Sequence, residues 1–211
     1  MKLNLSLLVL ALACMSVARA QTEKGTKTLG ISVNYSTLKN DRDGIAYEKT
    51  KNFGLGPSFS YFVKDKLELG ASLNYFREDR DYEGQNNYIS SLEGQQLGAT
   101  VFLRKHIMFS EHFGIRTGPF ASLFSGDSET VYPNQPKQEM TSKGFSGGLN
   151  MGIEYFPVKS IGLAANLATI SYNHTKQEVK GVPGAVNKIN SFDLDVTNGL
   201  NLSIFLVFGA K

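Results

Sequence analysis

Residues 191–208, with the sequence SFDLDVTNGLNLSIFLVF, carry the clearest strand signal in the chain. Apolar residues fill every even-numbered position from 192 to 208 except 198, and polar residues or glycine fill the odd-numbered positions from 191 to 203. A two-residue repeat places successive side chains on opposite faces of a β-strand. This stretch therefore predicts a long strand with one apolar face and one face of small polar residues.

The same alternation recurs along the rest of the chain. It is found in seven earlier segments, at 29–35, 53–61, 67–75, 97–103, 113–123, 145–155 and 161–167. The connections alternate in length: those near 39–50, 78–93, 125–143 and 173–190 are long and polar, and those near 63–66, 105–112 and 157–160 are short. Long loops at one end and short turns at the other are typical of outer-membrane barrels. We therefore predict an all-β fold, an eight-stranded antiparallel up-and-down transmembrane β-barrel.

The composition of the polar face indicates which side of the barrel meets lipid. A soluble ligand-binding barrel has an apolar interior and an exterior rich in lysine and glutamate, and a membrane barrel has the reverse arrangement. Here the polar face consists mostly of Gly, Ser, Asn and Thr, which suit the crowded lumen of a narrow barrel. We expect the Leu, Ile, Val and Phe face to contact lipid, with the soluble barrel as the weaker alternative.

The first twenty residues have the features of an export signal. Lys2 supplies a positive start, residues 3–17 are largely apolar, and Ala18-Arg19-Ala20 fits the small-x-small rule for signal peptidase. We predict cleavage after Ala20, which leaves residues 21–211 as a single barrel domain. The one cysteine, Cys14, lies within the signal, so that domain would contain no thiol.

The export signal, the start of the mature chain at Gln21–Gly25, the eight alternating segments and the closing strand at 200–211 together resemble a known group. They are similar to the small outer-membrane β-barrel families of Gram-negative bacteria, the OmpA/OmpX-like and "porin family" barrels. The resemblance implies location in the outer membrane, among its lipid and lipopolysaccharide. It implies no single activity, because such families include adhesins, small channels, structural anchors and a few lipid-modifying enzymes.

Charge and candidate chemistry narrow the function classes. The chain has 22 Lys and Arg against 19 Asp and Glu, without a basic patch, so we expect no nucleic-acid partner. A lipid-modifying barrel enzyme would need a Ser–His–acid set, for which Ser171, His174 and Glu178 are the local candidates in a polar loop. Residues 40–44 and 78–81 resemble fragments of calcium loops but lack the regular ligand spacing. We therefore predict no catalytic, cofactor-binding or metal-binding residues.

Several function hypotheses remain open. The leading one is a non-enzymatic surface protein whose four long loops take a structural role or contact an unidentified ligand outside the cell. The alternative is a narrow channel for small or apolar solutes, suggested by phenylalanines at inward positions. These are Phe62, Phe102, Phe120, Phe124, Phe156 and Phe205. A soluble carrier and a lipid-modifying enzyme rank below both. Because a closed barrel has no edge that demands a partner, we expect a monomer.

Four charged residues occupy inward positions near the short-turn end. They are Glu68, Arg104, Arg116 and Glu154, on four consecutive predicted strands. The interior of an eight-stranded barrel is just wide enough for side chains to fill, and isolated charges there are costly. We therefore predict an interior ion-pair cluster with Arg–carboxylate contacts that closes the barrel. His106 and His112 are predicted to lie in the short turn at 105–112.

Overall fold

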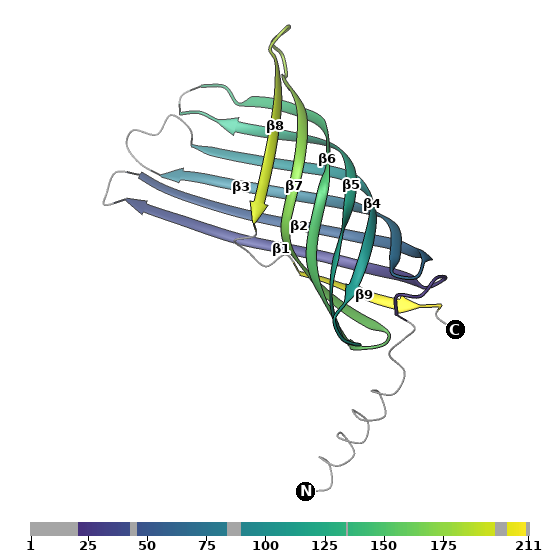
Figure 1. The fold of residues 1–211 in the computed structure, drawn as a ribbon. Helices are drawn as coiled ribbons and strands as arrows, with labels where there is room; N and C mark the ends of the chain where they lie inside the picture. The colour runs from purple at the N-terminus through teal and green to yellow at the C-terminus, as the bar shows by residue number, and fades with distance from the viewer. Residues whose placement is uncertain (1–20, 43–45, 84–89, 134, 197–201, 210–211) are drawn as a thin grey trace, which may run out of the picture.

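A computed structural model describes residues 21–42, 46–83, 90–133, 135–196 and 202–209. These residues form nine antiparallel strand segments (Figure 1). The segments are β1 Lys27–Arg42, β2 Ala46–Lys64, β3 Leu67–Glu83, β4 Ser91–Met108, β5 Phe113–Val131, β6 Gln138–Val158, β7 Ile161–Val179, β8 Val186–Val196 and β9 Leu202–Phe208. No helix in the described part of the chain is long and apolar enough to cross a membrane. The predicted export signal and its cleavage site lie outside the described residues.

The strands close into a ring. Each strand from β1 to β7 pairs with its neighbour in sequence, and β9 pairs with both β7 and β1. β8 pairs with β7 further along, from Ala168 to Glu178, so β8 and β9 together occupy the place of the predicted eighth strand. The prediction of an eight-stranded up-and-down barrel is confirmed.

The apolar face is on the outside of the ring. The exposed large hydrophobic side chains form a band around the barrel, and the last strand shows the pattern most clearly: Leu202, Ile204 and Leu206 are 50–52% exposed. Between them, Ser203 lines the lumen and Phe205 is 7% exposed. An apolar exterior around a polar lumen is the arrangement of a membrane barrel and contradicts the soluble carrier.

One strand departs from strict alternation. The pairing of β6 with β7 shifts between Met151 and Gly152, because Met151 pairs with Ala168 and Gly152 with Asn166. Leu167 is the extra residue of this β-bulge, which moves the outward positions from odd to even numbers along β7. Strict alternation continued from the segment at 161–167 would place Ala168 on the inner face, but Ala168 pairs with the outward residues Met151 and Val196. That expectation was wrong, because a bulge leaves only an irregular alternation in the sequence.

The prediction of four long loops also needs correction. Most of each predicted loop is paired strand: Lys39 pairs with Lys49, Asp81 with Ser91, and Glu178 with Val186. The strands thus continue beyond the apolar band as hairpins, which extend from one end of the barrel in Figure 1. Polar composition misled the prediction, since a ladder in water needs cross-strand pairing but no apolar face.

The opposite end, called here the short-turn end, is compact. Its turns lie at 65–66, 109–112 and 159–160, within the short connections predicted from the sequence but shorter than predicted. Residues 21–26 fold against it, because the Lys66 amide donates to Thr22 O and the Gly25 amide donates to Phe62 O. Gln21, Thr22 and Thr26 are buried there. The N-terminal segment therefore covers part of this end of the lumen.

Candidate functional site

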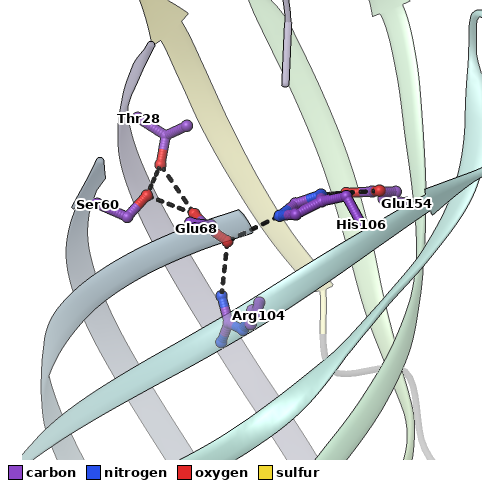
Figure 2. A network of polar contacts seen from close by, with 6 residues as sticks. All are labelled: Thr28, Ser60, Glu68, Arg104, His106 and Glu154. Atoms are coloured by element: carbon purple, nitrogen blue, oxygen red, sulfur yellow. Dashed lines mark hydrogen bonds and ion pairs between the residues drawn. The ribbon is translucent and has the colours of Figure 1, made fainter. Parts of the chain in front are cut away.

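The polar network inside the short-turn end is centred on Glu68 of β3. Its side chain is almost fully buried, and it pairs in register with Arg104 of β4. One carboxylate oxygen accepts hydrogen bonds from the hydroxyls of Ser60 and Thr28, the latter at 3.4 Å. The other lies 3.9 Å from Arg104 Nη1 and 3.1 Å from His106 Nε2 (Figure 2). Both oxygens of a buried carboxylate thus have partners, as the burial of charge demands.

His106 joins Glu68 to Glu154. Its Nδ1 lies 2.9 and 2.8 Å from the two carboxylate oxygens of Glu154, on the side of the ring opposite the contact with Glu68 (Figure 2). Both His106 and Glu154 are 1–2% exposed. The sequence placed His106 in a turn, but β4 continues to Met108 and the side chain points inward. Extending the even-numbered inward positions past Arg104 would have identified it.

The guanidinium groups of Arg104 and Arg116 each lie over a phenylalanine ring. The Arg104 guanidinium lies 3.7 Å from the ring centre of Phe102, and that of Arg116 lies 5.7 Å from the ring centre of Phe205. Each ring lies over a glycine on the neighbouring strand. A Cβ at Gly70 would meet the Phe102 ring at 2.5 Å, and one at Gly162 would meet the Phe205 ring at 2.2 Å. Glycine makes room for the rings, which support the cations through cation–π attraction.

The four residues predicted to pair are brought to one level, and one Arg–carboxylate contact links two of them. Of the two arginines in this set, Arg104 lies within ion-pair distance of a carboxylate, that of Glu68. Glu154 is bound by His106, and Arg116 lies over Phe205. The residue missing from the prediction, His106, makes the central contacts of the cluster.

Apolar side chains close the barrel below this network. Phe62 and Phe156 are 1% exposed, and they stand next after Ser60 and Glu154 on the inward faces of β2 and β6. The Phe62 ring lies 5.0 Å from that of His106, and the Phe156 ring meets Phe205 edge to face at 5.6 Å. Three of the six phenylalanines that suggested a channel, Phe62, Phe156 and Phe205, thus pack at this level. Network and layer together are called here the plug, defined by Phe62, Glu68, Arg104, His106, Glu154 and Phe156.

A polar cavity of about 320 Å³ lies above the plug. Its wall is made mostly of Ser, Thr, Asn and Gly, from positions such as Ser58, Asn74, Thr100 and Asn150. Its charged lining residues are Glu68, Arg104 and Arg116. The cavity offers space and hydrogen-bonding groups, and its charge is concentrated at its floor.

The candidate catalytic set is not assembled. Ser171 points into the lumen and is 7% exposed, whereas His174 points outward beside Phe145, with ring centres 5.3 Å apart. Glu178 pairs with Lys176 on the outer hairpin. Ser171 and His174 lie on opposite faces of β7, since their separation in sequence is odd and no bulge lies between them.

The calcium-loop fragment at 78–81 is likewise divided between two faces. Glu78 pairs with Arg80 on the inner face of β3, and Asp79 with Arg77 on the outer face. In the described ranges, no group of three or more His, Cys, Asp or Glu side chains is arranged to hold a metal ion.

The outer faces of the hairpins carry mixed charge beyond the apolar band. Lys180 Nζ lies 3.1 Å from Glu139 and 3.4 Å from Asp127. The hydrogen bond to Glu139 and the nearby carboxylates raise the pKa of Lys180, and the hydroxyl of Thr141 with Lys180 lowers the pKa of Asp127. These pairs hold neighbouring hairpin strands together in water.

A closed ring with an apolar exterior, a polar lumen and a buried plug defines a small membrane-spanning β-barrel. The sequence profile described as "Outer membrane protein beta-barrel domain" matches residues 5–203. The chain belongs to this family, which places it in the bacterial outer membrane.

Solved structures of outer membrane proteins resemble this chain. The crystal structure of a major outer membrane protein from Thermus thermophilus matches with a TM-score of 0.53 and 12% identity, over 87% of this chain and 98% of that chain. Ail, the attachment invasion locus protein of Yersinia pestis, gives 0.45 and 14% over 88% and 99%. OprG from Pseudomonas aeruginosa gives 0.44 and 18% over 90% and 99%. None of the curated proteins shows a significant match.

Proposed function

We propose that the chain is a non-enzymatic outer-membrane protein with a closed lumen, whose hairpins act at the cell surface. The observation that carries this proposal is the plug. Its carboxylates and imidazole are held by several contacts each, and Phe62 and Phe156 fill the level below them. A barrel that is closed at one end and projects paired hairpins at the other is suited to contacts outside the membrane.

The hairpins supply the surface for such contacts. They are paired strands with mixed charge, including Arg77, Glu93, Lys137 and Lys180 on their outer faces. We infer that basic side chains just beyond the apolar band contact lipopolysaccharide phosphates and that the hairpin ends contact an extracellular ligand. The ring closed by β9 and β1 favours a monomer.

Cysteine labelling tests the orientation. Glu178→Cys places a thiol on an exposed hairpin position, and Ser160→Cys places one in an exposed short turn. A membrane-impermeant maleimide applied to intact cells should label Glu178→Cys, and should label Ser160→Cys only after lysis. The opposite pattern would overturn the assignment of the hairpins to the cell surface.

The narrow channel remains the second candidate because of the polar cavity, whose lining extends as far as Glu68 and Arg116. Single-barrel recordings in a planar bilayer separate the two functions. We expect no steady open state, because ions would have to displace the plug. A steady conductance that persists after purification would support the channel and contradict the closed barrel.

A further inference from the structure

The hydrogen-bond geometry around His106 determines how many protons the side chains of Glu68, His106 and Glu154 share. Both ring nitrogens of His106 face carboxylate oxygens, of Glu154 at 2.8–2.9 Å and of Glu68 at 3.1 Å. A neutral imidazole donates from one nitrogen only, and an ionised carboxylate only accepts. Two satisfied contacts therefore require either an imidazolium or a protonated carboxyl group. In both cases Glu68, His106 and Glu154 together carry a net charge of −1.

The two arginines outweigh that charge. Arg104 and Arg116 line the same cavity floor as Glu68 and remain protonated in proteins. The five side chains thus carry a net charge of about +1, obtained as two positive charges less one. A buried excess charge inside a narrow barrel is costly unless a counter-charge lies beside it.

Among the described residues, Arg116 has no carboxylate within ion-pair distance, and Glu68 and Glu154 act on it only from further away. Arg104 has Glu68 at 3.9 Å. For Arg116, the contact within the described residues is the Phe205 ring, and no ion pair or hydrogen bond to its guanidinium occurs among them. The guanidinium faces the cavity, where Asn150, Gly152 and Ser203 also contribute to the lining.

We propose that the cavity is a binding site for a small monoanion, held by Arg116 with help from Arg104. A guanidinium offers several N–H donors in one plane, and the hydroxyl and amide groups of the wall can complete the shell of the ion. The space of about 320 Å³ admits such an ion with water around it. The ligand is a halide or the carboxylate group of a small solute.

Bromide tests the site directly, because its anomalous X-ray scattering shows where the ion binds in a crystal. The folded protein in a nonionic detergent is crystallised with sodium bromide, and a peak is expected beside the Arg116 guanidinium. In solution, bromide replaces sulfate, a dianion, at constant pH and ionic strength while thermal unfolding is followed by the heat-dependent gel shift. At saturation, each tenfold rise in bromide should lower the unfolding equilibrium constant about tenfold.

Three variants make the measurement specific. Arg116→Gln should fold and lose both the peak and the bromide response, whereas Arg116→Lys should keep a weaker response. Arg77→Gln removes the same charge from an exposed hairpin position and should respond as the unaltered protein does. Repeating the titration with formate decides between sources: a response to both ions extends the site to carboxylates, and a response to bromide alone restricts it to inorganic ions.

The proposal is overturned if no bromide peak lies in the cavity and Arg116→Gln responds to bromide as strongly as the unaltered protein. Arg116 would then be neutralised by water and by distant charge alone. Bromide found only on the hairpins would be an adventitious ion and would equally count against the site.

Discussion

The two ends of this barrel hold their charged side chains in opposite environments, one buried and one exposed to solvent. At the short-turn end, Glu68, His106 and Glu154 are almost fully buried, and their positions are fixed by mutual contacts. At the hairpin end, pairs such as Lys180 with Glu139 are about half exposed. Buried charges must be paired or their desolvation is not offset, whereas solvated pairs contribute little. The same residue types therefore determine stability at one end and surface character at the other.

Replacing the same residue type at each end should give the largest contrast. His106→Leu leaves Glu68 and Glu154 buried without their shared donor, and should cost about 3–5 kcal/mol of unfolding free energy. His174→Leu on the outer face of β7 is the control and should leave stability nearly unchanged. Urea unfolding in lipid vesicles measures both. Equal losses would show that the network does not stabilise the barrel.

The lipid-facing wall between the two ends should be the next most sensitive region. Ile204→Arg places a charge in the middle of the apolar band and should cost about 2–4 kcal/mol. Ser203→Asn changes the adjacent inward residue and should cost much less, because the lumen accepts polar groups. The same unfolding assay applies, and similar losses at 203 and 204 would contradict the assigned faces.

Shortening a hairpin should have the smallest effect on stability. Replacing residues 128–140 by Asn-Gly joins Asp127 to Thr141, which face each other across β5 and β6, through a two-residue turn. The barrel should retain its heat-dependent gel shift and its unfolding free energy, since the apolar band and the plug are untouched. If the shortened protein fails to fold, the hairpins contribute to the barrel itself and the contrast between the two ends is lost.

Particular residues show which features of the fold the sequence predicts and which it does not. Alternation placed Leu202, Ile204 and Leu206 outward and Ser203 inward, as the structure has them. It failed at Ala168, where a bulge reverses the faces, and at the hairpins, where polar strands were taken for loops. His106 was missed because a short connection was assumed to begin before it. Each error concerns the pairing of two strands, either its register or its extent, and the composition of one segment does not specify that pairing.

The sequence by itself determined the class of this protein, because a two-residue repeat with small polar residues opposite large apolar ones is compatible with few structures other than a membrane barrel. It also predicted that Glu68, Arg104, Arg116 and Glu154 point inward, since the faces of a regular strand follow from its numbering. Only the tertiary structure decided how those charges combine. Contacts across the lumen depend on strand tilt and stagger, which no single strand specifies. That geometry joined Glu154 to His106 and left Arg116 facing the cavity.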